Sequence, residues 1–433
     1  MSDPDVIVVG GGSVGLSFAT EAAGLGARVV LAETDALGGT CVNRGCVPKK
    51  LMWTAAKAIH EAAGLHASGV VSAPPEVDYS RLARSAADHV ASLQKMQAER
   101  LRDAGVEVRR TTAKLHDDLS VSLDDAPDAP LRAPRVVWCA GARPVKPDFD
   151  GADLAETSDD LFGWRRRPDR LLVLGGGYIS CEFAAIFAAF GTEVTLVDHG
   201  DRLLSGFAPA LSRLAKEHLH DAGVDTRLGG ELQALREDGG RRRAEFADAP
   251  SACFDRVLAA VGRTPALGSP AETFDLRTSD AGAVRIDDRF SPGVDGLHVV
   301  GDAADRMPLT PVATADGACL ARQLFGDGDA AIPLDHAART AFVLPPIAQV
   351  GEVGEGEAER FSPLGHAVKG ETPPEAWRLV ENPQGALSGV ALAGEAAHEM
   401  IGWAAQSVAE GRRRAALPRA VAIHPSSSEE PLG

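Results

Sequence analysis

The chain has 433 residues, of which 45% are hydrophobic and 24% are charged, an ordinary globular composition that suggests roughly two to four domains. Its formal net charge of −17 argues against nucleic acids and anionic membranes as partners, because both are polyanions. No run reaches the ~18 apolar residues of a membrane span, and the first residues lack the basic region of a signal peptide, so we expect a cytoplasmic protein without membrane segments.

The first predicted element is a buried parallel strand over residues 6–9, because this run is continuously apolar. Glycines follow at Gly10, Gly12 and Gly15, in the Gly-x-Gly-x-x-Gly spacing, and a small-residue helix is expected to run to about residue 23. A second strand ends at Glu33, 23 residues after Gly10. Together these features predict a dinucleotide-binding βαβ unit, with the pyrophosphate at the helix N-terminus and a ribose on Glu33.

The same construction recurs in the middle of the chain. An apolar strand over 171–174 leads into Gly175 and Gly177, with Ser180 in place of the third glycine. The next strand ends at Asp198, again 23 residues after the first glycine. Two such units predict two dinucleotides, one of which passes electrons to the other, although two unrelated nucleotide ligands remain the alternative.

Glycine–proline segments at 141–144 and 262–265 each end an apolar strand and predict the crossings into and out of a second domain. After about residue 332 the sequence changes to short strand-like runs, with one long helix expected near 396–410. The predicted domains are 1–145 with 266–332, 146–265, and 333–433.

Six cysteines do not make a disulfide framework in a chain of this length, and none has zinc-site spacing, so no metal site is expected. Four of them, at positions 139, 181, 253 and 319, have apolar neighbours and are expected to be small buried residues. Cys41 and Cys46 differ because they lie together in the glycine-rich segment 38–50. Five residues apart, they can form a disulfide across a distorted first helical turn, where the helix dipole is expected to lower the pKa of a thiol.

The segment GGTCVNRGCVPKK at 38–50 resembles the redox-active segment of the flavoprotein disulfide reductases, and among them it is most like that of the glutathione reductases. The resemblance covers nearly the whole chain. Further similar segments are GGGYISCE at 175–182, GLHVVGD at 296–302, LTPVA at 309–313, PPI at 345–347 and HPSSSEE at 424–430. The resemblance implies an α/β chain with two Rossmann-like domains, one for FAD and one for NAD(P), and a C-terminal α+β dimerisation domain.

The resemblance also implies roles for individual residues. Cys46 would be the thiol next to the flavin, in a charge-transfer pair with it, and Cys41 would attack the substrate disulfide. His424, held by Glu429, would act as acid and base on the cysteines of the partner subunit in a homodimer. Lys49 would form an ion pair with Glu182 near the flavin.

Tyr178 would cover the nicotinamide pocket, and Asp302 would bind the ribitol of FAD. The candidate cofactor-binding residues are Gly10, Gly12, Ser13, Gly15, Glu33, Thr40, Cys41, Lys49, Asp302, Thr310, Gly175, Gly177, Tyr178, Ile179, Glu182, Asp198 and Gly262.

Several positions depart from the family pattern. His199 and Ser205 align with arginines of the NADPH-specific enzymes, and Asp198 precedes them, so NADH is expected to be favoured over NADPH. Thr20 and Ala318 align with the arginines that hold the carboxylates of glutathione disulfide. These departures suggest a small disulfide with fewer carboxylates, such as that of glutathione amide.

Two alternatives remain open. The chain is also compatible with a dihydrolipoamide dehydrogenase, a complex subunit that works in the opposite direction, although the VPKK segment and the proline-containing histidine motif favour the glutathione reductase side. A flavin-containing redox sensor without turnover is the other alternative, but it would need neither the cysteine pair nor His424 and Glu429.

Overall fold

A computed structural model describes residues 3–73, 75–328, 334–361, 366–369, 375–419 and 424–429. Contacts within the chain divide it into two compact units. The first comprises Met1–Lys49, Ser85–Pro144 and Arg263–Leu334, and the second comprises Lys50–Arg84, Val145–Gly262 and Asp335–Gly433. The division into three domains, as expected from the sequence, stays a prediction.

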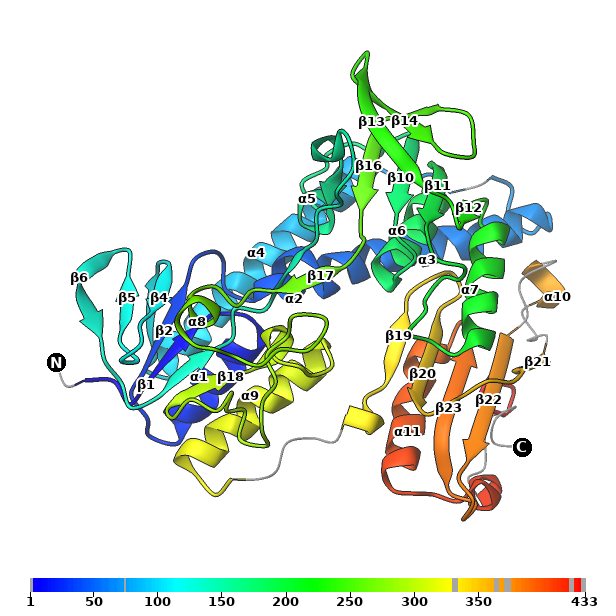
Figure 1. The fold of residues 1–433 in the computed structure, drawn as a ribbon. Coiled ribbons are helices and arrows are strands. Elements are labelled where there is room, and N and C mark those ends of the chain that lie inside the picture. The colour runs from blue at the N-terminus through cyan, green and yellow to red at the C-terminus, as the bar shows by residue number, and fades with distance from the viewer. Residues whose placement is uncertain are drawn as a thin grey trace. The chain divides into compact units, whose positions relative to one another are not determined.

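A five-stranded parallel sheet forms the centre of the first unit. Its strands are β1 Val6–Val9, β2 Val29–Glu33, β3 Glu107–Arg110, β7 Val136–Trp138 and β18 Leu297–Val299. They follow the order β18-β7-β1-β2-β3, in which β1 is the middle strand and is buried along its whole length (Figure 1). Since β2 and β7 lie on opposite sides of β1, the loop after β1 occupies the point where parallel α/β sheets bind ligands.

Two helices of the first unit, α1 Ser13–Gly24 and α9 Thr310–Phe325, pack closely against each other. The Ser17 hydroxyl donates to the backbone carbonyl of Thr314 at 2.7 Å. A Cβ atom on Gly317 would lie 2.8 Å from the carbonyl oxygen of Val14, so the close approach requires glycine at this position.

The remaining elements of the first unit connect these parts. They are α2 Gly39–Arg44, β4 Ala113–Leu115, β5 Val121–Leu123, β6 Ala126–Leu131, β8 Ala142–Pro144, β17 Arg263–Pro265, α8 Ser269–Thr273 and the 3-10 turn η2 Gly301–Ala303. Strands β4, β5 and β6 form an antiparallel sheet, and β8 pairs with β17. The residues of two long helices, α3 Cys46–Ala67 and α4 Tyr79–Asp103, are divided between the units.

The second unit contains a second five-stranded parallel sheet. Its strands are β9 Glu156–Thr157, β10 Arg170–Leu174, β11 Glu193–Asp198, β12 Asp225–Leu228 and β16 Arg256–Ala259. The order is β12-β11-β10-β16-β9, so β10 has the same central place that β1 has in the first unit. The helices and turns of this part are η1 Ala152–Leu154, α5 Ser158–Leu161, α6 Tyr178–Ala189 and α7 Pro209–Asp221. Most residues of α6 are buried, which fits its almost continuous apolar sequence.

Two antiparallel sheets complete the second unit. The smaller one consists of β13 Leu232–Asp238, β14 Arg241–Phe246 and β15 Ala252–Phe254. The C-terminal sheet has the order β19-β20-β23-β22-β21. Its strands are β19 Arg339–Ala341, β20 Ile347–Gly351, β21 Glu359–Phe361, β22 Glu375–Glu381 and β23 Leu387–Ala393, accompanied by η3 Leu334–His336, α10 His366–Lys369, α11 Ala397–Ala409 and η4 Arg414–Arg419.

Helix α11 packs on the C-terminal sheet through Ile401, Ala404 and Val408, which share a core with Ala348 and Val390 (Figure 1). This helix lies within one residue of the expected 396–410. The parallel Rossmann-like sheets and the C-terminal antiparallel sheet confirm the mixed α/β class. Among the described residues, no helix combines the length and the apolar character that crossing a membrane requires.

Candidate active site

The two cysteines of the glycine-rich segment lie on two different helices. Cys41 is in the short helix α2, and Cys46 is the first residue of α3. The helices are separated at Gly45, whose backbone approaches α2 so closely that a Cβ atom there would lie 2.9 Å from the carbonyl oxygen of Thr40. The sequence predicted one distorted helical turn, and the structure instead has a break between helices that brings the two thiols within hydrogen-bonding distance.

The pKa of the Cys41 thiol is raised, so the lowered thiol pKa expected from the helix dipole does not apply to this member of the pair. The largest cause is the hydrogen bond with Cys46, followed by burial. The hydroxyl of Thr310 and the positive charge of Lys49 act in the other direction but are outweighed. The Cys41 thiol therefore keeps its proton at neutral pH, and making it a nucleophile requires a base.

Thr310 links the cysteine pair to the start of helix α9. Its Oγ1 atom lies 3.5 Å from the Sγ atom of Cys46, and it is the first residue of this 16-residue helix. A helix N-terminus favours negative charge, so its position beside Cys46 favours a thiolate there. Three residues singled out from the sequence, Cys46, Lys49 and Thr310, thus come together around Cys41.

Asn43 and Gln94 were not identified from the sequence. Between the two cysteines, Asn43 donates to the carbonyl of Ala36 at 2.9 Å and accepts from Gln94 on α4, also at 2.9 Å. These bonds fix α2 on both sides. No sequence signal marks Gln94, because only the fold brings α4 beside the cysteine segment.

A third missed residue, Arg263, connects two expected cofactor residues. Its guanidinium donates to the Thr40 hydroxyl at 3.3 Å, and its charge lowers the pKa of the Asp302 carboxyl. Burial of Asp302 has the larger effect and raises that pKa overall. The sequence predicts a domain crossing at 262–265 and a cofactor contact at Gly262 alone, although the arginine next to Gly262 was an available signal.

The first glycine loop has no room for side chains. Gly10 has a φ of +112°, and a Cβ atom on Gly15 would overlap the carbonyl oxygen of Gly10. The Glu33 carboxylate accepts from the backbone N–H groups of Gly11 at 2.6 Å and Asp35 at 2.8 Å, so it lies directly beside the loop.

This loop also supports the cysteine segment. A Cβ atom on Gly39, the first residue of α2, would lie only 2.7 Å from the Cα atom of Gly12, and the N–H of Gly38 donates to the carbonyl of Gly11 at 2.8 Å. Gly12 precedes α1 without any side-chain cap, which leaves Ser13 and the rest of the first turn without a capping side chain. The predicted nucleotide loop and the cysteine segment are therefore one packed structure.

The second glycine loop follows β10 in the same way. Gly175 has a φ of +109°, and a Cβ atom there would lie 2.6 Å from the carbonyl oxygen of Ala260. Gly177 precedes α6, again without a side-chain cap, and Tyr178 and Ile179 are the first two residues of the helix. Tyr178 is 47% exposed at this end of α6.

Asp198 ends β11 beside this loop. A Cβ atom on Gly176 would lie 2.6 Å from its Oδ2 atom, and the same oxygen accepts from the N–H of Gly200 at 3.2 Å. Gly262 follows β16 in the same sheet with a φ of +138°.

Glu182 lies on α6 and is almost completely buried, at 3% exposure. Its carboxylate accepts from the N–H of Phe342 at 2.9 Å. Lys49 belongs to the first unit and Glu182 to the second, and the ion pair expected between them stays a prediction.

His424 and Glu429 lie together near the C-terminus. The imidazole Nδ1 atom is 2.7 Å from Oε1 of Glu429, and the other carboxylate oxygen accepts from the N–H of Ser426 at 3.0 Å. The Ser426 N–H and then His424 lower the pKa of the Glu429 carboxyl, which is ionised at neutral pH. An ionised carboxylate on Nδ1 leaves Nε2 of this exposed histidine as the atom that can exchange a proton.

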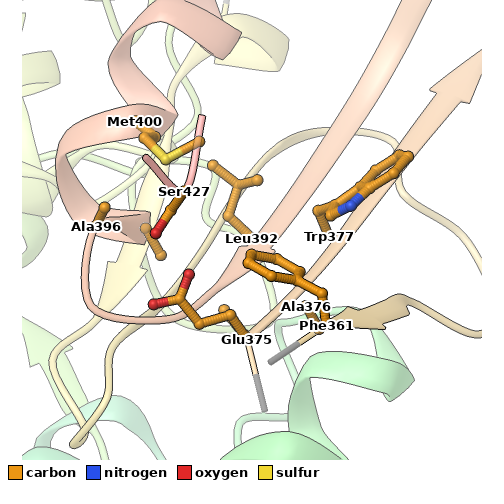
Figure 2. A pocket seen from close by; sticks show the side chains of 10 residues that line it. Phe361, Glu375, Ala376, Trp377, Leu392, Ala396, Met400 and Ser427 are labelled. Carbon is orange, nitrogen blue, oxygen red and sulfur yellow. The ribbon is translucent and has the colours of Figure 1, made fainter. Parts of the chain in front are cut away.

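Figure 2 shows the hollow against which this segment packs. Ser427, between His424 and Glu429, lines it together with Glu375 of β22 and Met400 of α11. The other lining residues are Phe361, Ala376, Trp377, Leu392, Ala393, Ala396 and Ala397. The histidine segment is thus supported by the C-terminal sheet and α11.

Thr20 and Ala318, the two positions without the expected arginines, lie on α1 and α9. The Thr20 hydroxyl donates to the carbonyl of Leu16 in its own helix at 2.7 Å. Of the four isolated cysteines, those at 139, 181 and 319 are buried as expected. The expectation was wrong for Cys253, which is partly exposed because it lies on β15, where its Sγ atom is 3.8 Å from a carboxylate oxygen of Asp238.

Residues 4–317 match the model of the pyridine nucleotide-disulphide oxidoreductases. The chain belongs to this family. It is similar to a glutathione reductase of Burkholderia cepacia, with 32% identity over 99% of this chain and 97% of the relative. A glutathione reductase of Nostoc is 30% identical over 99% of this chain and 98% of its own length. A dihydrolipoyl dehydrogenase 2 of Haloarcula marismortui is 29% identical over 98% of this chain and 94% of its own length.

These similarities confirm the family expected from the cysteine segment. The chain is a glutathione-reductase-like enzyme of the flavoprotein disulfide reductases.

Proposed function

We propose that this enzyme uses a pyridine nucleotide, NADH in preference to NADPH, and bound FAD to reduce a small disulfide. The observation that supports this most directly is the hydrogen-bonded pair of Cys41 and Cys46 at the break between α2 and α3, beside the N-terminus of α9. Two thiols in contact can exchange between dithiol and disulfide, and the neighbouring helix start favours a thiolate in the reduced pair.

The residues of the first unit fit FAD. The uncapped N-terminus of α1 and the glycines before it suit a pyrophosphate, and the Glu33 carboxylate beside the loop suits ribose hydroxyls. The Asp302 carboxyl, whose pKa is raised by burial, suits a hydroxyl of the ribitol. Bound FAD supplies hydride acceptance from the nicotinamide and delivery of the electron pair to the cysteine disulfide.

The cysteines and His424 then complete the reaction. With two electrons and two protons, the Cys41–Cys46 disulfide becomes two thiols. His424 takes the proton from Sγ of Cys41, this sulfur bonds to one sulfur of the substrate, the substrate S–S bond breaks, and the leaving thiolate takes the proton back from His424. Cys46 then passes its proton to His424, and its thiolate attacks Sγ of Cys41, which re-forms the Cys41–Cys46 disulfide. The second thiolate leaves Cys41 and takes this proton, so that it is released as a thiol.

His424 has a defined task in this scheme. Because the Cys41 thiol keeps its proton, attack needs a base, and an imidazole held on Nδ1 by Glu429 is suited to it. Following the family resemblance, we place this histidine at the cysteines of a second copy, so that the homodimer is the active form. The same resemblance leads us to keep the three-domain division as 1–145 with 266–332 for FAD, 146–265 for the nucleotide and 333–433 for dimerisation.

The preference for NADH is supported by Asp198. A carboxylate at the end of the second strand accepts hydrogen bonds from both ribose hydroxyls and repels a 2′-phosphate. Its contacts with the second glycine loop support a role at the adenosine ribose.

The substrate we propose has fewer carboxylates than glutathione disulfide, as the disulfide of glutathione amide does. Thr20 and Ala318 cannot form the bidentate ion pairs of arginines, and each such bond to a charged group contributes about 1.5–3 kcal/mol.

A dihydrolipoamide dehydrogenase is the second candidate, because a relative with that name is nearly as similar as the glutathione reductases. Both activities use the same cysteine pair. They differ in the dithiol or disulfide that reaches Cys41 and in the direction of electron flow.

One set of kinetic measurements tests these assignments. Steady-state kcat/KM is determined for NADH and NADPH with glutathione disulfide, its diamide and lipoamide, and for NAD⁺ with dihydrolipoamide. We expect the highest value for NADH with the diamide. Equal or better kcat/KM for glutathione disulfide rejects the substrate proposal, and turnover only with dihydrolipoamide establishes the second candidate.

A further inference from the structure

The loop after β11 places an imidazole next to the carboxylate of Asp198. The Nδ1 atom of His199 lies 3.7 Å from Oδ1 of Asp198. The carboxylate is held in place, because its other oxygen accepts from the Gly200 N–H and only 12% of the side chain is exposed. The imidazole itself is 95% exposed.

The other cations on the elements around this loop are engaged elsewhere. Arg202, three residues further on, turns its guanidinium to the carbonyl of Ser205 at 2.7 Å. On β12, Arg227 donates to the carboxylate of Asp225 at 2.7 Å. The other charged residues in the loops after β11 and β12 are Asp201 and Glu231, and both are acidic.

We propose that His199 makes the nucleotide selectivity of this site depend on pH. With a neutral imidazole, Asp198 favours an unmodified ribose, and with an imidazolium the same pair admits a ribose 2′-phosphate. This inference rests on the proposed function, in which the second glycine loop binds the pyridine nucleotide.

The charge of the imidazole sets the direction in which the nucleotide selectivity changes with pH. Imidazole is the side chain that ordinarily gains a proton between about pH 8 and pH 5. An imidazolium beside Asp198 offsets the negative charge that repels a phosphate, and its N–H donates a charge-assisted hydrogen bond to the phosphate oxygens. Tolerance of the 2′-phosphate therefore rises as the pH falls.

The phosphate itself also responds to pH. A phosphate monoester loses one of its negative charges as the pH falls through about 6. Without His199, its repulsion by Asp198 therefore also weakens on acidification. At about pH 6.5 most of the phosphate still carries both negative charges, so the part of the shift that is lost in His199→Gln measures the contribution of His199.

The experiment is calorimetric titration of the full-length, flavin-containing protein with adenosine 5′-monophosphate and with adenosine 2′,5′-bisphosphate, which differ only in the 2′-phosphate. We expect the ratio of the two dissociation constants to shift by about tenfold toward the bisphosphate between about pH 8 and pH 6.5. In His199→Gln at most a small part of this shift remains, because the phosphate has lost little of its charge at about pH 6.5. In His199→Arg, the bisphosphate is favoured at both pH values.

The chain offers a matched control. His220 on α7 also lies beside the carboxylate of a neighbour in the sequence. Its Nδ1 atom is 3.4 Å from Oδ1 of Asp221, and its side chain is 85% exposed. His220→Gln should keep the shift of the unmodified protein. A constant ratio in the unmodified protein, or the same shift in His199→Gln, overturns the inference while binding of the monophosphate still supports the nucleotide site. Failure of both ligands to bind overturns the nucleotide site and the inference together.

Discussion

The two glycine loops share one construction but differ at the third glycine position. At Gly15 the helix α1 approaches the preceding turn so closely that a Cβ atom would overlap the carbonyl oxygen of Gly10. In the second loop Ser180 occupies this position, and its hydroxyl donates to the carbonyls of Leu174 at 3.4 Å and Ala260 at 3.3 Å. Equal spacing in the sequence therefore does not mean equal packing.

The segments that follow the acidic residue differ even more. After Glu33 the chain continues through Gly38 and Gly39 into α2, and the backbone of Gly39 packs on the first glycine loop. After Asp198 the chain forms a loop with His199 and Arg202 and then enters α7. We infer that the first region combines nucleotide binding with thiol chemistry, whereas the second region selects the nucleotide.

The largest expected effect breaks the chemistry of the first region. Cys41→Ser and Cys46→Ser should each reduce disulfide turnover by at least about 1000-fold, because each removes one member of the exchanging pair. The visible absorption spectrum distinguishes them: Cys41→Ser should keep long-wavelength charge-transfer absorbance from a thiolate at Cys46, and Cys46→Ser should lose it. The control is Cys253→Ser on β15, which should leave both properties unchanged. Retention of the absorbance and full turnover in Cys46→Ser would show that the two roles are wrongly assigned.

The next largest effect concerns proton transfer, which we assign to His424 and to neither glycine loop. His424→Ala should slow disulfide reduction by about 10²–10⁴-fold, the usual range for general acid–base catalysis, while flavin reduction by NADH should not change. Rapid-mixing kinetics measure the two half-reactions separately. Glu429→Gln should have a smaller effect on the same step, because the imidazole remains but loses its ionised partner. A change below about twofold in His424→Ala would contradict the assignment.

An exchange at the third loop position tests the packing difference directly. Gly15→Ser should lower the free energy of unfolding by about 3 kcal/mol or more, because the overlap is with backbone that cannot yield, and flavin should be lost with it. Ser180→Gly should lower it by only about 1 kcal/mol, the usual penalty of glycine in a helix. Denaturant unfolding and the visible absorbance of bound flavin measure both. Similar losses for the two variants would show that the loops are equally tight.

Local patterns in the sequence were sufficient for the strand–glycine–helix units and for the family. The strand over 6–9 and the position of Glu33 beside the glycine loop depend on residues that are close in the sequence, and the structure has both where expected. Sequence reasoning missed Gln94 and Arg263, because their partners, Asn43 and Thr40, are 51 and 223 residues away along the chain. The effect of a helix dipole on a thiol of the pair could be expected from the sequence, but the raised pKa of Cys41 could not, because it arises from the hydrogen bond to Cys46 and from burial.

Among the described residues, each unit has a buried histidine, and these two histidines allow a test based on stability. His298 of β18 and His218 of α7 each place Nδ1 2.9 Å from a backbone carbonyl, of Arg289 and Pro345 respectively. Burial lowers the pKa of both, and that of His218 to about 4. When the pH falls below about 6.5, His218 binds a proton in the unfolded chain but not in the folded one. The free energy of unfolding of the second unit therefore decreases until about pH 4, by up to about 3 kcal/mol.

The pH dependence of thermal unfolding measures this loss. His218→Gln should remove the contribution, so that its unfolding changes less between about pH 6.5 and pH 4 than that of the unmodified protein. His220→Gln, on the exposed side of the same helix, is the control and should behave like the unmodified protein. An unchanged pH dependence in His218→Gln would mean that other groups cause the acid instability.

The smallest effect separates the two acidic residues that end β2 and β11. Asp198→Asn should lower kcat/KM for NADH and raise it for NADPH, so that their ratio falls by about tenfold, because the variant accepts less strongly from ribose hydroxyls and no longer repels a 2′-phosphate. Glu33→Gln should leave this ratio unchanged and instead weaken the retention of flavin, measured by the absorbance that passes a filtration membrane. Both variants replace a carboxylate by the corresponding amide, so a difference between their effects arises from the region in which the residue lies. If Glu33→Gln altered the nucleotide ratio, or if Asp198→Asn released flavin without changing it, the two regions would have to exchange their assignments.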